Sequence, residues 1–119
     1  MIPLLIWNAR GLGALVKSYF LASVISRHKA AVVVVLEHKQ KPNRIGEFSK
    51  RLRMHEITQD EVVNSHIWIF WQMRCNVVLI QAGDQFLTIK VTLGPDLVYV
   101  SFVYGSCNRH SREAFWRDL

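Results

Sequence analysis

Four consecutive valines, Val32 to Val35, constrain the fold of this chain more than any other feature of its sequence. β-Branched residues favour extended backbone, and an uninterrupted apolar run of this length is typical of a strand covered on both faces. Residues 3–8 form a second short apolar run, and residues 14–27 between the two contain neither glycine nor proline. The order strand, helix, strand predicts a βαβ unit with parallel strands, and therefore an α/β fold.

The helix expected over residues 14–27 carries apolar side chains at fourfold spacing, which predicts one buried stripe. These residues are Leu12, Val16, Phe20 and Val24. Basic residues follow at 27–29, where cations stabilise the C-terminus of a helix. A second, more exposed helix is predicted over residues 43–53, with Asn43 as its N-cap.

The second half of the chain is predicted to form antiparallel strands. Strand-like runs occupy residues 66–71, 76–81, 85–93 and 97–103, and turn signals at residues 83–84 and 94–96 separate the last three. In residues 86–91, polar and aromatic side chains alternate with Leu87, Ile89 and Val91, which predicts one face exposed to water. Ser111 is expected to cap a further helix. With no repeat or linker, residues 1–119 are interpreted as one domain.

The formal net charge of +6 favours a polyanionic partner, because lysine and arginine gain most by displacing the counterions of phosphates. Basic residues cluster in three stretches, 27–29, 38–53 and 109–117, although solvated faces would give the same pattern. Two cysteines make no disulfide framework, so both thiols are expected to be reduced in an intracellular protein. The apolar run at residues 2–6 is too short to span a membrane. The oligomeric state is left open.

Asn8 and Glu37 each follow a predicted parallel strand, at the end where open α/β sheets place their ligands. Mg²⁺ takes oxygen ligands, often only one or two protein carboxylates completed by water and phosphate. The pair is therefore a candidate metal site. In the alternative interpretation, Glu37 begins a charged loop and Asn8 caps a turn. None of the five histidines shows zinc-ligand spacing, so each is expected to be a surface or core residue.

Several segments along the chain form an ordered set of motifs. Residues 7–13 read W-N-A-R-G-L-G, residues 27–29 read R-H-K, and residues 36–37 read L-E. Residues 67–71 read I-W-I-F-W, and residues 103–110 read V-Y-G-S-C-N-R-H, with Arg112, Glu113 and Trp116 after them. In this order they resemble the nuclease domain of plant non-LTR (LINE-type) retrotransposon polyproteins. That domain belongs to the endonuclease/exonuclease/phosphatase family.

The resemblance implies a DNase I-like, four-layered α/β sandwich, of which this chain would be the N-terminal half. It also implies an endonuclease that nicks DNA, uses Mg²⁺ or Mn²⁺, and works in the nucleus. By motif, Glu37 would bind the metal with help from Asn8, while Tyr104 and Asn108 would approach the scissile phosphate. Arg10 and Arg109 would contact nucleic acid.

The chain departs from the family pattern in ways that affect activity. Ser65 and His66 replace the two glycines of a G-G-I-W motif, and Cys107 replaces a proline. The family's later G-D-x-N and S-D-H motifs, the second of which supplies the general base, do not occur in these 119 residues. We therefore expect a truncated domain that is inactive alone. Two other interpretations stay open: a noncatalytic nucleic-acid-binding remnant, and part of a phosphoesterase acting on small substrates.

Overall fold

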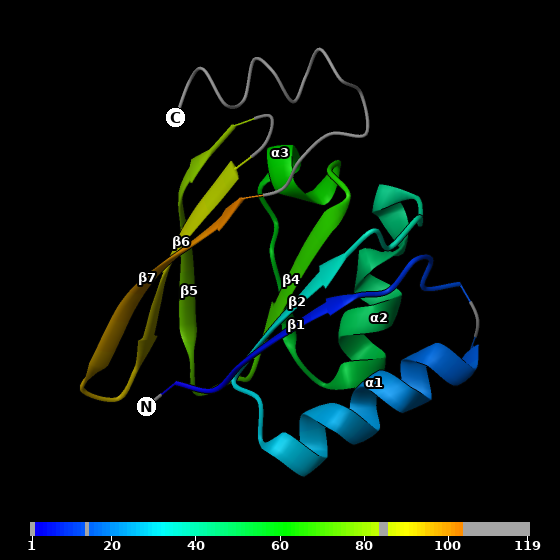
Figure 1. Ribbon diagram of the computed structural model, residues 1–119, viewed down its shortest axis with the longest axis horizontal. Helices are drawn as coiled ribbons and strands as arrows, with labels where there is room; N and C mark the ends of the chain where they lie inside the picture. The colour runs from blue at the N-terminus through cyan, green and yellow to red at the C-terminus, as the bar shows by residue number, and fades with distance from the viewer. Residues whose placement is uncertain (1, 14, 84–85, 104–119) are drawn as a thin grey trace.

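The computed structural model describes residues 2–13, 15–83 and 86–103, which form two sheets and a layer of helices (Figure 1). The first sheet and its helices comprise β1 (Leu4–Asn8), α1 (Leu15–His28), β2 (Val32–Leu36), the 3₁₀ turn η1 (Pro42–Arg44), α2 (Ile45–Leu52), β3 (His55–Glu56), α3 (Asp60–Val63) and β4 (Ile67–Trp71). The second sheet comprises β5 (Asn76–Ala82), β6 (Phe86–Leu93) and β7 (Asp96–Val103).

The valine run forms β2, a central strand of the first sheet, as the sequence predicted. The strand order is β1-β2-β4-β3, with β1 parallel to β2 and β4 antiparallel to both β2 and β3. Val32, Val33, Val34 and Val35 are all fully buried. The strands β1 and β2 are parallel and are connected along the chain by α1, which confirms the predicted βαβ unit.

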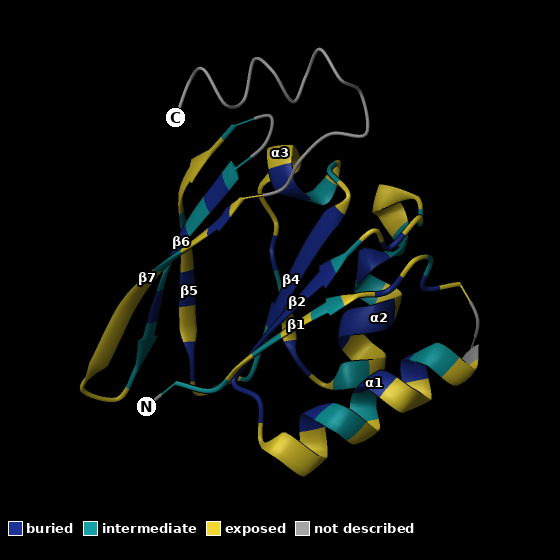
Figure 2. Cartoon of the chain, viewed as in Figure 1, coloured by how far each residue is buried: buried dark blue, intermediate teal, exposed yellow. Residues whose placement is uncertain are grey.

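The two faces of the first sheet pack against different layers. On one face, Trp68 of β4 lies 5.8 Å from the ring of Phe48 on α2, so this face contacts the helices. The register places Val33 and Val35 on the same face, and Val34 and Ile69 on the other. The second sheet lies on that other side (Figure 1). The described residues therefore form three layers, and the core fills the spaces between them (Figure 2).

The second sheet is antiparallel, in the order β5-β6-β7, as the hairpin signals predicted. Along β6, Leu87, Ile89 and Val91 are buried, whereas the alternating residues of the strand are half-buried. The predicted alternation along this strand is therefore confirmed, but the face expected to be exposed to water is half-buried. No helix among the residues that the structure describes is long and apolar enough to cross a membrane.

The predicted buried stripe was wrong for the middle two of its four residues, whereas Leu12, which precedes α1, is fully buried and Val24 is half-buried. Val16 is 70% exposed and Phe20 is 58% exposed, while Ser18, Leu21 and Ile25 are buried. Successive helical residues turn by about 100°, so a strict fourfold series drifts by about 40° at each step and leaves the covered side. Mixed spacing of three and four keeps the buried residues on one side.

Other details of the helical layer also differ from expectation. Asn43 is not an N-cap, because it lies inside η1; α2 begins at Ile45, and its N-cap Arg44 makes no side-chain capping hydrogen bond. The short elements β3 and α3 were not predicted. Both depend on β4, since β3 pairs with it and α3 packs beside it.

Ile89 and Ile80 offer a matched test of the packing between the sheets. Ile89 on β6 is fully buried, and Ile80 on the neighbouring β5 is 50% exposed. We expect Ile89→Ala to lower the free energy of unfolding by about 2–5 kcal/mol, because the cavity it leaves cannot collapse fully. Ile80→Ala should change it by only about 0.5 kcal/mol. Urea unfolding followed by circular dichroism measures both; equal losses would contradict the proposed layer packing.

Candidate functional site

The parallel pairing of β1 and β2 brings Asn8 and Glu37 to the same edge of the first sheet. Asn8 lies opposite Leu36 in the register, and Glu37 follows directly. The amide of Ala9 donates to the carbonyl of Leu36 over 2.9 Å, which continues the pairing past the last strand residue. Both candidate side chains are exposed. The two residues therefore lie on neighbouring strand ends, as the sequence predicted, with their side chains open to solvent.

The loops that follow the two strands are joined by backbone hydrogen bonds. The amide of Gly11 donates to the carbonyl of Glu37 over 2.8 Å, and the amide of Leu12 donates to that of His38 over 2.7 Å. Leu12 is fully buried beneath them. The residues that carry the candidate site thus belong to one hydrogen-bonded unit.

Left-handed backbone is concentrated in these two loops. Arg10, Glu37 and Lys39 have φ angles of 49°, 52° and 55°, and Gly11 has a φ angle of 99°. The left-handed region is unfavourable for residues with a side chain, so it persists only where the surroundings impose it. Here the paired loops impose it on the residue predicted to bind the metal and on two basic neighbours.

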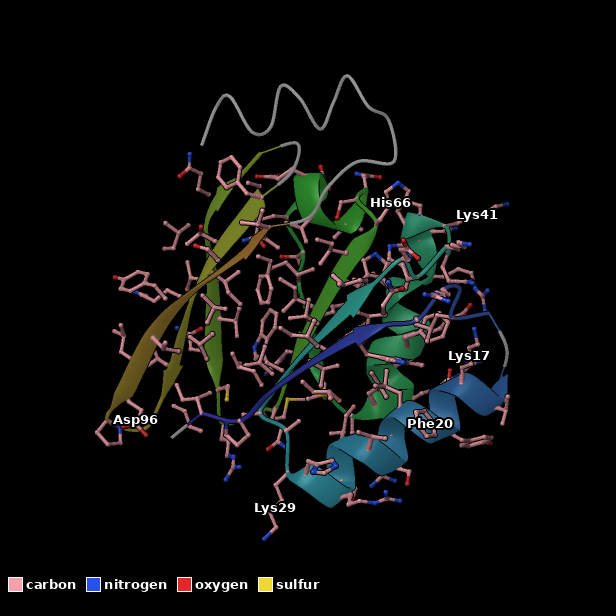
Figure 3. All side chains as sticks on the ribbon, viewed as in Figure 1. Lys17, Phe20, Lys29, Lys41, His66 and Asp96 are labelled. Atoms are coloured by element: carbon pink, nitrogen blue, oxygen red, sulfur yellow. The ribbon has the colours of Figure 1, made fainter. Side chains whose placement is uncertain are left out.

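The side chain of Lys17 on α1 donates hydrogen bonds to the backbone of the loop after β1. Its ammonium group donates to the carbonyl oxygens of Ala9 over 3.0 Å and Gly11 over 2.7 Å, with a longer contact of 3.5 Å to that of Arg10. Figure 3 shows Lys17 near the start of the helix, beside this loop. An ammonium has three donors, and here they serve three successive carbonyls.

Nothing in the apolar periodicity predicted this contact, although one signal was available. Lys17 is the third residue of α1, and the first turn of that helix contains no acidic residue. A cation near the N-terminus of a helix opposes the helix dipole. A lysine at this position therefore indicates a partner that outweighs the unfavourable field.

His38 connects the loop after Glu37 to the loop before β4. Its Nδ1 accepts from the amide of Gln40 over 3.0 Å, and its Nε2 lies 2.8 Å from the carbonyl of Ser65. Its ring stacks on Trp68 with centroids 3.8 Å apart. Because Nδ1 accepts, Nε2 carries the proton and donates to Ser65. His38 is buried and both of its ring nitrogens have partners, so it is a satisfied core histidine, and burial lowers its pKa.

The donor atoms at this edge fit a hard divalent cation only in part. Among the described residues, no three His, Cys, Asp or Glu side chains converge. The carbonyls of Ala9 and Gly11 accept from Lys17, so the side-chain oxygens of Asn8 and Glu37 are the better candidates for ligands. A carboxylate with an amide oxygen suits Mg²⁺, which often binds few protein groups and keeps several waters.

Exposed basic side chains surround this edge. Arg10 lies in the first loop, and Lys39 and Lys41 lie in the second. By contrast, Arg44 pairs with Glu47 over 2.9 Å. The other predicted site residues, Tyr104, Asn108 and Arg109, lie outside the described residues.

Comparison with known proteins identifies the fold. No family model and no curated protein matches the sequence. The solved structure of the endonuclease domain of TRAS1, a telomere-specific non-LTR retrotransposon, superposes with a TM-score of 0.59 at 11% sequence identity. The chain has a DNase I-like fold. The match covers 99% of this chain and 53% of the other, so this chain spans about half the length of the endonuclease domain it resembles.

We expect Lys17→Met to loosen the first loop of this DNase I-like fold without unfolding the protein. The substitution removes the donors to Ala9 and Gly11 while keeping an unbranched side chain of similar length. Hydrogen exchange at the amides of Gly11 and Leu12, measured by NMR, should become faster. The control is Lys50→Met at an exposed position on α2. Unchanged exchange rates of these amides in the Lys17 variant would show that Lys17 does not stabilise the loop.

We expect His38 to make stability depend on pH below neutrality. Its pKa is lowered from 6.5 in the folded protein, so the unfolded chain binds this proton more readily. The free energy of unfolding should therefore fall as pH decreases through 6.5 and level off below the folded-state pKa. Urea unfolding as a function of pH measures this. His38→Gln should flatten the decline, and His28→Gln, at an exposed position, should not.

Proposed function

We propose that this chain is the N-terminal part of a metal-dependent endonuclease domain, from a non-LTR retrotransposon of the plant LINE type, that acts on DNA. The observation that carries the proposal is the placement of Asn8 and Glu37 on neighbouring ends of parallel strands in a chain with the DNase I-like fold. The motifs at residues 7–13 and 103–110 support the retrotransposon origin.

In the proposed site, Glu37 and Asn8 hold a Mg²⁺ or Mn²⁺ ion with their side-chain oxygens. Such an ion, when bound, stabilises charge on a phosphate oxygen and activates water. Arg10, Lys39 and Lys41 are exposed around the two loops, where they can contact backbone phosphates of DNA. Tyr104, Asn108 and Arg109 are proposed to contact the scissile phosphate and its neighbours.

The metal site can be tested directly by Mn²⁺ titration followed by the relaxation of water protons. We expect measurable binding by the wild-type chain, and at least a tenfold loss of affinity in Glu37→Gln, because the only carboxylate of the proposed site loses its charge. Glu61→Gln, which neutralises an exposed carboxylate on α3, serves as the matched control. Equal affinities of the two variants would exclude Glu37 as a ligand.

A nicking assay on supercoiled plasmid DNA with Mg²⁺ tests the reaction with the same proteins. We expect little or no cleavage by the wild-type chain, because a missing general base alone forfeits a factor of about 10²–10⁴ in rate. Robust cleavage that Glu37→Gln abolishes would show that these 119 residues suffice for catalysis. Salt-dependent DNA binding that needs no metal, with no Mn²⁺ site, would favour the noncatalytic remnant.

A further inference from the structure

A third strand brings one more side chain to the edge of the sheet that carries the candidate metal site. β4 begins where β2 ends, because the two strands are antiparallel and Ile67 pairs with Leu36. Extended by one position, this register sets His66 opposite Glu37, while Asn8 ends the strand on the other side of β2. Figure 3 shows His66 at the start of β4, at this end of the sheet. Residues from three neighbouring strand ends therefore meet at one edge.

Contacts that do not involve the imidazole of His66 hold the backbone that carries it. The preceding residue, Ser65, accepts from Nε2 of His38 through its carbonyl oxygen over 2.8 Å, and its hydroxyl accepts from the amide of Ile67 over 3.1 Å. His38 directly follows Glu37, so this hydrogen bond joins the neighbours of the two residues. Burial is the main cause of the lowered pKa of His38, and the charge on His66 adds to it, which places the two imidazoles within electrostatic range.

The three side chains at this edge are available to a ligand. Asn8, Glu37 and His66 are all exposed. Within residues 2–13, 15–83 and 86–103, none of these side chains takes part in a hydrogen bond or an ion pair. His66 differs in this from His38, whose two ring nitrogens both have backbone partners. Its imidazole nitrogens can therefore bind a ligand without breaking a contact of the fold.

We propose that His66 supplies an imidazole nitrogen to the divalent cation held by Glu37 and Asn8, and that this cation is a transition-metal ion such as Mn²⁺ in preference to Mg²⁺. The inference rests on the proposed function, because it requires that Glu37 and Asn8 bind a metal. The ligand set is then a carboxylate, an amide oxygen and an imidazole, one from each of three neighbouring strand ends.

The nitrogen ligand is what decides the choice of metal. Mg²⁺ is a hard cation that takes oxygen ligands and keeps several waters, whereas imidazole suits first-row transition metals. His66 stands where the G-G-I-W motif has glycine, which offers no side-chain ligand. A glycine at this position leaves a site with oxygen ligands only, and the histidine adds a ligand that Mg²⁺ does not favour.

Pulsed electron paramagnetic resonance of the chain loaded with Mn²⁺ tests the nitrogen ligand directly. We expect modulation from a coordinated nitrogen nucleus in the wild-type protein and loss of that signal in His66→Ala, which keeps both oxygen ligands. His55→Ala is the matched control, because His55 is also exposed but lies beside the other end of β4, opposite Trp71. Its signal should equal that of the wild type. His66→Gln is a second variant and should also lose the signal.

Displacement of Mn²⁺ by Mg²⁺, followed by the relaxation of water protons, measures the metal preference. His66→Ala should bind Mn²⁺ about tenfold more weakly, the size of loss that removal of a group supporting a metal ligand already causes. Its affinity for Mg²⁺ should stay close to that of the wild type, so the preference for Mn²⁺ falls by the same factor. Circular dichroism confirms that each variant is folded.

The possible outcomes separate this inference from the proposed function. Mn²⁺ that binds through Glu37 without a nitrogen signal would overturn the inference and leave the proposed metal site intact. A nitrogen signal that persists in both His66 variants, or an unchanged preference between the two metals, would do the same. A wild-type chain that does not bind Mn²⁺ would overturn both.

Discussion

The burial of β2 on both faces is the constraint on which the rest of the structure depends. Four valines have no polar group to present to water, so one face must be covered by helices and the other by a second sheet. The backbone of β2 must also pair on both sides, with β1 in parallel and β4 in antiparallel orientation. The parallel partner then ends beside β2 at the same edge, which is why Asn8 and Glu37 become neighbours.

Much of this arrangement could be predicted, because it follows from local pattern. The valine run, the uninterrupted helix of residues 15–28 and the alternation along β6 each have a period that sequence reveals. The failures occurred where tertiary contacts decide. The two residues of β3 form a strand only because β4 offers an edge, and Val16 and Phe20 stay exposed because no described element covers the end of the sheet beyond β1.

The candidate site likewise has features that could be predicted from the sequence and features that could not. The strand ends could be predicted, since the carboxyl ends of parallel strands lie at one edge. The contacts that hold the loops could not be, because Lys17 and His38 bind backbone carbonyls at sequence separations that follow no period: 8 residues for Lys17 to Ala9, and 27 for His38 to Ser65. Only the unfavourable position of Lys17 in its helix gave any sign. Side-chain to backbone contacts of this kind are specified by the completed fold.

The left-handed residues of the two loops lower the stability of the fold while they place charged side chains at the edge of the sheet. Glycine would adopt the backbone of Arg10, Glu37 and Lys39 without steric penalty, whereas each of these residues is strained by about 1–2 kcal/mol. A sequence selected for stability alone would favour glycine at these positions. A chain that keeps a carboxylate and two cations there has a lower free energy of unfolding but retains the charges. In laboratory selection for thermal tolerance, these three positions should therefore be among the first to drift.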